Sequence, residues 1–205
     1  MVRNLYIAHN IKCSDFTDLD LKQDSCDEKW GCAINIFKQR FWQRYFNPIK
    51  KLTSIAPTST SDNPSTFGFI ILGTCFLLIE TLAGFEDGRK SHETKSKELC
   101  VKGLRKFNLC DENGKCRIVE DGEAKKLYSI GRCALLHSAG TEGVQVTTSG
   151  PSITKISDDE FIMNRTKFSF EVEEMYTEYL KGLSNKDNIL FRDNFIKKMN
   201  FIAGA

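Results

Sequence analysis

One apolar segment constrains the fold of this chain more than any other feature. Residues 67–85 read FGFIILGTCFLLIETLAGF, nineteen residues with a single charged side chain, Glu80. About twenty apolar residues suffice to cross a membrane as a helix, but such a helix can also fill the centre of a helical domain. The glycines and the internal ionisable residue weigh against a membrane span. We therefore expect a central buried helix, in which the carboxylate of Glu80 must be paired or functional.

The composition is that of an ordinary globular protein. The 205 residues include 29 Lys and Arg against 27 Asp and Glu, which gives a net charge of +2, and 40% of the residues are hydrophobic. This length corresponds to one domain or two small ones, and it allows a sizeable core without a metal or disulfide staple. The 15 Phe predict a Phe-rich core. The near-neutral charge argues against a strongly basic nucleic-acid-binding coat but is compatible with a small, local phosphate site.

The eight cysteines do not show the spacing of a disulfide framework or of a zinc site. They stand at positions 13, 26, 32, 75, 100, 110, 116 and 133, and no CxxC occurs among them. Only Cys110 and Cys116 flank a turn, where a bridge is geometrically conceivable. We expect reduced thiols in a cytoplasmic protein, with no metal and no other cofactor. Residues 1–10 mix polar and apolar side chains and do not form a signal peptide, so we expect no membrane attachment.

Hydrophobic periodicity predicts a mostly helical chain. Ile34, Phe37, Phe41 and Tyr45 recur at helical spacing in a segment that Pro48 kinks or ends. Besides 67–85, the expected helices cover residues 28–51, 91–107, 120–139, 158–183 and 188–202. The turn chemistry indicates one small hairpin within 108–119, and a second that pairs residues 144–148 with 152–156.

The predicted fold class is therefore all-α. We expect a single-domain helical bundle over residues 28–205, with a small β-hairpin near residues 144–156. Residues 1–27 would form an N-terminal arm, and the Ser/Thr/Pro-rich residues 54–66 would form a linker loop.

An arginine and a histidine in the predicted fourth helix are the strongest candidates for chemistry. Arg132 precedes His137 by five residues. On a regular α-helix this spacing leaves the side chains about 140° apart, so the long Arg side chain or a local distortion must bring them together. An imidazole can transfer protons near neutral pH, and a guanidinium can stabilise charge on phosphoryl oxygens. The pair predicts phosphodiester chemistry, with His137 as general acid and base and Arg132 as the group that binds the phosphate.

This arrangement resembles the HEPN superfamily, whose members include metal-independent ribonucleases of toxin–antitoxin, abortive-infection and CRISPR-associated systems. The resemblance rests on Arg132 and His137 on a late helix, on the apolar helix with Glu80, on the polar helix after it, and on Tyr128 before the arginine. It extends over residues 28–202 at the level of architecture. It implies a homodimer in which both subunits contribute Arg132 and His137 to one site. The 2′-hydroxyl of RNA would be the nucleophile, and a cognate antitoxin would be a further partner.

Other residues complete the predicted site. By the same resemblance, Glu80 would orient Arg132, and Glu142 would orient His137 or be an ordinary loop acid. Arg40 and Arg44 lie in an aromatic stretch that would stack on RNA and contact its phosphates. The same stretch is also typical of a helix with one core face and one solvated face.

Several residues leave alternatives open or depart from the family pattern. Cys133 follows the arginine where the family usually has a polar residue, and this favours a catalytically silent HEPN-like binding or antitoxin-type module as the alternative function. Ala139 stands where family members regulated by nucleotidylation have a tyrosine, so that modification is not implied. Arg3 and His9 form a second match, which ranks lower because chain termini are often poorly ordered.

The two candidate residues also have purely structural interpretations. Arg132 is compatible with a structural ion pair to Glu80, and His137 is compatible with a helix C-terminal histidine that the helix dipole favours.

Overall fold

The computed structural model describes residues 5–55, 67–91, 94–133 and 143–204. The chain divides into two compact units, each assembled from separate stretches of sequence. Unit 1 contains Met1–Pro48, Gly84–Glu93 and Met175–Ala205, and unit 2 contains Ile49–Ala83 and Thr94–Glu174. The predicted arm, residues 1–27, belongs to unit 1 and includes regular structure.

Unit 1 is built from helices around an aromatic core. Its elements are β1 (Tyr6–Ala8), β2 (Ile11–Lys12), α1 (Cys13–Thr17), α2 (Asp27–Phe41), the π-helical turn η1 (Trp42–Phe46), α9 (Ile189–Ala203), and the C-terminal parts of α4 (Gly68–Glu86) and α8 (Arg165–Ser184). The ring of Phe37 is fully buried, and its centroid lies 4.4 Å from that of Phe41, 4.9 Å from that of Phe85 and 5.4 Å from that of Phe195. Such pairs each contribute about 0.5–1.5 kcal/mol beyond the area that they bury. The predicted Phe-rich core is confirmed.

Pro48 does not end the first long helix, although its effect on the backbone is visible. Because proline has no N–H, the helix lacks one backbone hydrogen bond at Pro48. The turn before Pro48 is π-helical: the N–H of Asn47 donates to the carbonyl oxygen of Trp42, five residues back. The chain then continues as α3 (Asn47–Ser54). The helix predicted over 28–51 is thus three consecutive helical segments.

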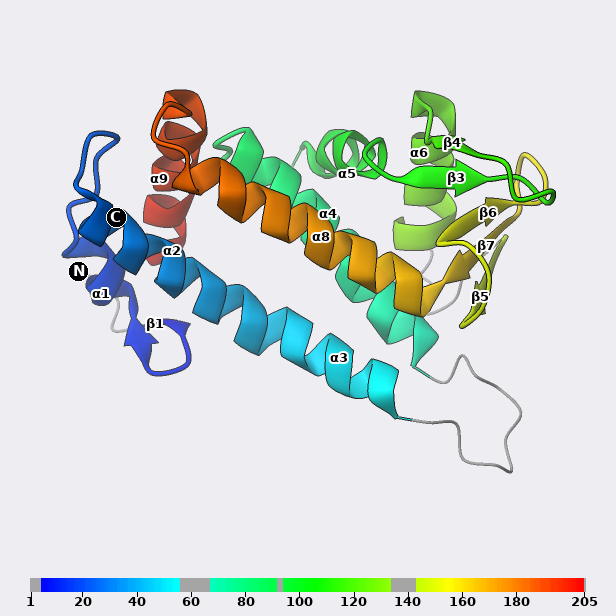
Figure 1. The fold of residues 1–205 in the computed structure, drawn as a ribbon, viewed down its shortest axis with the longest axis horizontal. Coiled ribbons are helices and arrows are strands. Elements are labelled where there is room, and N and C mark those ends of the chain that lie inside the picture. The colour runs from blue at the N-terminus through cyan, green and yellow to red at the C-terminus, as the bar shows by residue number, and fades with distance from the viewer. Residues whose placement is uncertain (1–4, 56–66, 92–93, 134–142, 205) are drawn as a thin grey trace. The chain divides into compact units, whose positions relative to one another are not determined.

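Unit 2 combines helices with a five-stranded mixed sheet. Its helices are most of α3, the first parts of α4 and α8, α5 (Ser96–Leu104), α6 (Asp121–Leu127) and the π-helical turn η2 (Tyr128–Cys133). The strands are β3 (Asn108–Cys110), β4 (Cys116–Ile118), β5 (Val144–Thr147), β6 (Ile153–Lys155) and β7 (Phe161–Asn164). The strand order is β4-β3-β6-β7-β5, with β4 at one edge and β5 at the other (Figure 1).

The sheet shows that the all-α prediction was wrong, and so was the predicted pairing of 144–148 with 152–156. Strand β5 pairs in parallel with β7, from Val144 opposite Phe161 to Thr147 opposite Asn164. Strand β6 runs antiparallel to β7 and parallel to β3. Strand β7 falls within the helix predicted over 158–183, because three apolar residues next to a helical pattern cannot be recognised as a strand by periodicity. The β3–β4 hairpin lies within the predicted range 108–119, whereas the parallel pairing of β3 with β6 joins segments far apart in sequence, which local patterns do not reveal.

Helix α4 is the buried central helix that the sequence predicts. Most of its apolar side chains have no exposed surface, including Ile71, Leu72, Cys75, Phe76, Leu78 and Ile79. Among the described residues it is the one helix long and apolar enough to span a membrane, and 67% of its apolar window is buried inside the protein. Helix α9 also agrees with its predicted range, whereas α5 and α8 are shorter than expected.

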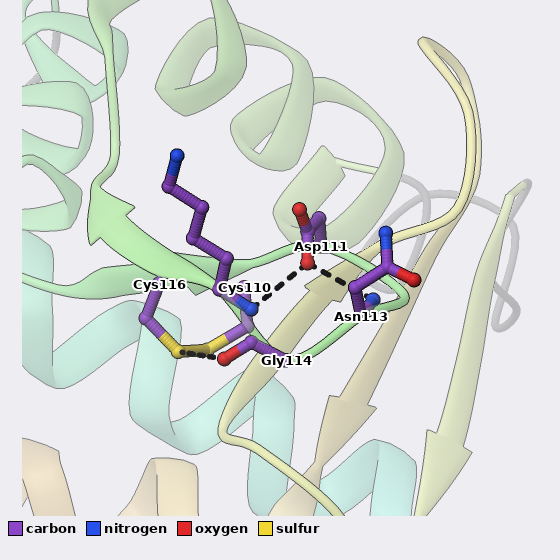
Figure 2. The surroundings of a disulfide bond; sticks show 6 residues. Cys110, Asp111, Asn113, Gly114 and Cys116 are labelled. Atoms are coloured by element: carbon purple, nitrogen blue, oxygen red, sulfur yellow. Dashed lines mark hydrogen bonds between the residues drawn. A yellow bond between two sulfur atoms is a disulfide. The ribbon is translucent and has the colours of Figure 1, made fainter.

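The β3–β4 hairpin contains a disulfide. Cys110 lies directly opposite Cys116 in the antiparallel register, and their sulfur atoms are bonded (Figure 2). In the turn between them, Oδ1 of Asp111 accepts hydrogen bonds from the backbone N–H groups of Asn113 and Lys115, both at 2.9 Å. These two cysteines are therefore not the reduced thiols expected from spacing alone.

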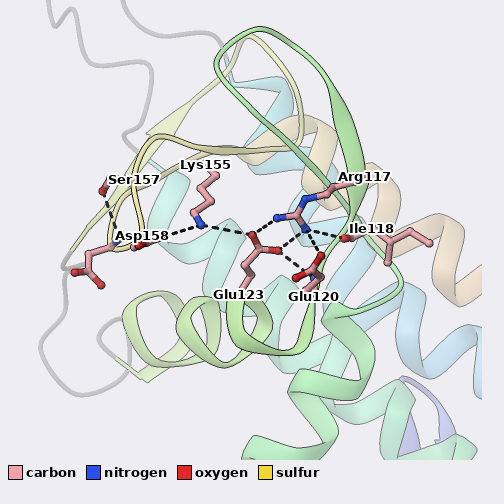
Figure 3. Close-up of polar contacts among 8 residues, drawn as sticks. Arg117, Ile118, Glu120, Glu123, Lys155, Ser157 and Asp158 are labelled. Atoms are coloured by element: carbon pink, nitrogen blue, oxygen red, sulfur yellow. Dashed lines mark hydrogen bonds and ion pairs between the residues drawn. The ribbon is translucent and has the colours of Figure 1, made fainter.

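An ionic cluster links this hairpin to α6 and to the β6–β7 connection. Arg117 on β4 makes a bidentate pair with Glu123 on α6, at 2.9 and 2.5 Å, and Lys155 on β6 pairs with Asp158 at 2.8 Å (Figure 3). The Glu123 side chain is only 11% exposed. Burial acts to raise the pKa of Glu123, but the hydrogen bonds and charge of Arg117 outweigh it and lower the pKa. Nζ of Lys155 also lies 3.7 Å from Oε1 of Glu123, so the first turn of α6 is fixed to both β4 and β6.

Candidate functional site

The candidate site is centred on Glu80 of α4. Glu80 lies within this buried helix, whose other acid, Glu86, is its last residue, and Glu80 is 8% exposed. A carboxylate in such a position is costly unless cations or hydrogen-bond donors surround it. Its environment in unit 2 supplies both.

Two side chains from other elements donate to the same oxygen of Glu80. The Oγ hydroxyl of Ser96, at the start of α5, donates to Oε2 at 2.6 Å. Nη2 of Arg132, on η2, donates to Oε2 at 3.0 Å. The contact between Glu80 and Arg132 that the sequence predicts is therefore present. It joins α4, α5 and η2 at one point.

Arg132 is also placed by Tyr128, four residues before it. The Cζ atom of Arg132 lies 5.5 Å from the centroid of the Tyr128 ring, which is a cation–π contact. Burial raises the pKa of Tyr128, and hydrogen bonding to Cys133 raises it further, whereas the Ser96 side chain and the charge of Arg132 lower it. Tyr128 therefore stays a neutral phenol near neutral pH. We call Glu80, Ser96, Tyr128 and Arg132 the Glu80–Arg132 cluster.

Arg132 and Tyr128 lie on a π-helical turn, which is rare and is frequent at functional sites. Gly131 lies within this turn and faces α4. A Cβ atom at Gly131 would lie 2.7 Å from Cζ of Phe76, a ring that is fully buried. The absence of a side chain thus lets η2 come close enough to α4 for Arg132 to reach Glu80.

Arg132 reaches the surface although it is paired. Its side chain is 22% exposed, against 10% for that of Glu80. A guanidinium has five N–H donors, and within the described part of the chain its one hydrogen bond is the bond to Glu80. The site therefore presents an oriented positive group with N–H donors left for a ligand such as a phosphate.

Two cysteines adjoin the cluster. Cys100 on α5 is buried, and burial together with the charge of Glu80 raises its pKa to about 12, although Arg132 acts to lower it. This thiol stays protonated and is not a nucleophile at neutral pH. Cys133, the residue that departs from the family pattern, is partly buried and interacts with Tyr128.

The other predicted site residues are not brought to this cluster within the described residues. His137 and Glu142 lie outside them, as do Arg3 and residues 56–66 of the predicted linker. Arg40 and Arg44 belong to unit 1, where they bind β1: Nη1 of Arg40 donates to the carbonyl oxygen of Ile7 at 2.7 Å, and Nη2 of Arg44 donates to that of Tyr6 at 3.0 Å. Their role in RNA binding stays a prediction.

Sequence reasoning missed Ser96. Its one local signal is a position near the start of a polar helix, and nothing in the sequence relates it to Glu80, sixteen residues earlier. No group of three or more His, Cys, Asp or Glu side chains that could bind a metal ion occurs among residues 5–55, 67–91, 94–133 and 143–204. Comparison with known protein families, curated proteins and solved structures finds no match to this chain.

Proposed function

We propose that this protein is a metal-independent endoribonuclease of a toxin or phage-defence type. Arg132 would bind the scissile phosphate, and His137 would act as general acid and base, in a groove shared by two subunits. The observation that carries the proposal is the state of Arg132: it is oriented by a buried carboxylate and a tyrosine ring, and it still reaches the surface. The assignment of His137 rests on sequence.

The proposed reaction needs only side chains of this chain. One His137 imidazole removes the proton from the ribose 2′-hydroxyl, and the 2′-oxygen attacks the adjacent phosphorus. The bond from phosphorus to the 5′-oxygen breaks, and that oxygen takes a proton from an imidazolium, which is the second subunit's copy of the same histidine. The products are a 2′,3′-cyclic phosphate and a 5′-hydroxyl. General acid–base catalysis contributes typically 10²–10⁴-fold to such a step.

Arg132 would stabilise the negative charge that grows on the non-bridging phosphoryl oxygens. A preorganised donor of this kind contributes about 10²–10³-fold to kcat. Preorganisation is the contribution of Glu80, because the salt bridge fixes the guanidinium before substrate arrives. Glu80 is thus a positioning residue in this proposal, and Tyr128 supports the same orientation.

The test is cleavage of total RNA by the pure protein in the presence of EDTA. Arg132→Ala and His137→Ala should each lose cleavage by at least about 100-fold while keeping the circular dichroism of the wild type. Lys167→Ala, an exposed basic residue of unit 2, serves as the matched control and should cleave normally. A folded Arg132→Ala protein that cleaves as well as the wild type would remove Arg132 from the mechanism. Wild-type protein that fails to cleave at high concentration favours the alternative, a catalytically silent binding or antitoxin-type module.

A further inference from the structure

A basic groove lies between α5 and α6 of unit 2. Its volume is about 570 Å³. Four basic and two acidic side chains line it: Lys97, Lys102, Arg105, Lys125, Glu98 and Asp121. We call it the α5–α6 groove.

Helical spacing explains why these cations share one surface. Lys97, Val101 and Arg105 are four residues apart, so they form one row along α5 and the residue that follows it. Lys97 and Arg105 are separated by about 12 Å along the helix axis. Val101 lies between them and is 7% exposed. The row therefore has a cation at each end, Lys97 and Arg105, and one apolar side chain, Val101, between them.

The two acids of the groove offset only part of its positive charge, although Asp121 also interacts with the charge of Arg105. Asp121 pairs with Lys125 on its own helix, at 2.6 Å. Glu98 pairs with Lys95, at 2.7 Å. The side chains of Lys97 and Arg105 make no hydrogen bond or ion pair within the part of the chain that the structure describes. The groove therefore retains positive charge along its length and is suited to an anionic ligand.

The elements that form the groove also position two residues of the Glu80–Arg132 cluster. Ser96, which donates to Glu80, is the residue before Lys97. Tyr128, which contacts Arg132, lies three residues after Lys125, about one helical turn. The side chains of Ser96 and Tyr128 interact with each other, so the start of α5 and the turn that follows α6 meet at the cluster.

We infer that the α5–α6 groove binds the sugar–phosphate backbone of single-stranded RNA and leads it to Arg132. This inference rests on the proposed function. A single strand carries one negative charge on every nucleotide, so it can contact cations spaced along a groove, and Arg105 can bind a phosphate through two N–H donors. A patch that bound one small anion would need its cations gathered at one point, whereas here they are distributed over two helical turns.

The test is the affinity of the full-length protein for a fluorescein-labelled, single-stranded 2′-O-methyl RNA, which cannot be cleaved through its 2′-position. Fluorescence anisotropy is measured at several salt concentrations for the wild type and for Lys97→Glu/Arg105→Glu. The control is Lys115→Glu/Lys167→Glu, which makes the same change in net charge at exposed positions of unit 2 outside the groove. Loss of two phosphate contacts should raise Kd at least about tenfold and reduce the slope of log K against log salt by about 1.4, at about 0.7 per contact for a single strand.

Three results would overturn the inference. The groove variant and the control could weaken binding equally, the wild type could fail to bind the RNA, or a poly-glutamate peptide could bind the groove with the same affinity and salt slope as RNA. Cleavage of unmodified RNA is measured separately. If the wild type binds the 2′-O-methyl RNA through the groove but cleaves no RNA, the proposed function is refuted and RNA binding by the groove is supported. If the groove variant cleaves RNA with an unchanged KM, the proposed function is supported and RNA binding by the groove is refuted.

Discussion

Glu80 is the residue on which the geometry of Arg132 depends. Glu80→Gln keeps the shape of the side chain but removes the charge, and it leaves a partly buried guanidinium without its counter-ion. We expect the free energy of unfolding to fall by about 1–3 kcal/mol. If Arg132 acts in catalysis, kcat should fall by about 10–100-fold with a smaller change in KM, because the loss is one of orientation.

The control for this variant is Glu112→Gln, at the exposed tip of the β3–β4 hairpin, which should change neither quantity. Glu80→Asp should recover part of kcat, since it restores the charge at a shorter reach. Unchanged kcat in a folded Glu80→Gln protein would mean that the ion pair is only structural.

Gly131 permits the close contact between η2 and α4. In Gly131→Ala the new methyl would lie 2.7 Å from Cζ and 2.9 Å from Cε2 of the buried Phe76 ring. The ring or the turn must move, and such overpacking costs about 1–3 kcal/mol. Urea unfolding of this variant should therefore show a lower midpoint than the wild type.

Gly122→Ala is the matched control, because a Cβ there meets no atom within 4 Å. It lies in α6, where alanine is favoured over glycine by about 0.5–1 kcal/mol. The two Gly→Ala changes should thus shift the unfolding midpoint in opposite directions. Equal shifts would contradict the packing that we describe for Gly131.

At the scale of elements, the β3–β4 hairpin is closed twice, by its disulfide and by the Asp111 turn. Closing so short a loop covalently contributes at most about 2 kcal/mol through the entropy of the unfolded chain. Because the Asp111 hydrogen bonds and the Arg117–Glu123 pair remain, Cys110→Ser/Cys116→Ser should stay folded and lose no more than this.

Thermal unfolding with and without dithiothreitol measures the contribution of the bridge. Dithiothreitol should lower the Tm of the wild type to that of the double variant and should not change the variant. Cys26→Ser/Cys32→Ser, which replaces two exposed free cysteines, is the control and should remain sensitive to the reductant. Wild type whose Tm is insensitive to the reductant would contradict a bridged hairpin.

The elements that could be predicted are those with local signals. The apolar run gave α4 nearly to the residue, and the amphipathic pattern gave α9, because both helices have a long periodic stretch. Strands β3 and β4 form the hairpin that the turn chemistry predicts within 108–119, and β5 and β6 lie within the predicted ranges 144–148 and 152–156. Their arrangement in one sheet was missed, because β5 pairs with β7 and β6 pairs with β3 and β7. The π-helical turns were also missed, since a single extra residue in a helical turn leaves no mark on the hydrophobic pattern.

At the scale of the molecule, the candidate site is partly readable from sequence. A carboxylate in the middle of an apolar helix needs a cation or a hydrogen-bond donor, so the sequence predicts a partner for Glu80. Arg132 was the expected partner because it lies on the predicted late helix that carries the candidate site. Ser96 could not be foreseen, because its contact with Glu80 depends on how α5 packs beside α4. The division into two units could not be predicted from the sequence either, because neither unit is one continuous segment. Unit 1 combines both ends of the chain with a short middle segment, and unit 2 combines two segments between them.

The proposed site has a consequence for subunit composition. If two subunits share one groove, each inactive single variant still carries one of the two functional groups. A dimer of one Arg132→Ala chain and one His137→Ala chain keeps one arginine and one histidine in that groove. Co-expression of the two variants with different affinity tags, followed by tandem purification, isolates such mixed dimers. This mixed dimer lacks the second imidazole, so water must protonate the leaving 5′-oxygen, and we expect only part of the RNA cleavage to return. Dimers of either variant alone keep only one kind of functional group and should stay at least about 100-fold below the wild type. Mixed dimers as inactive as their parents would contradict a shared groove in which one arginine and one histidine suffice, and a protein that sediments as a monomer at all concentrations would exclude a shared groove.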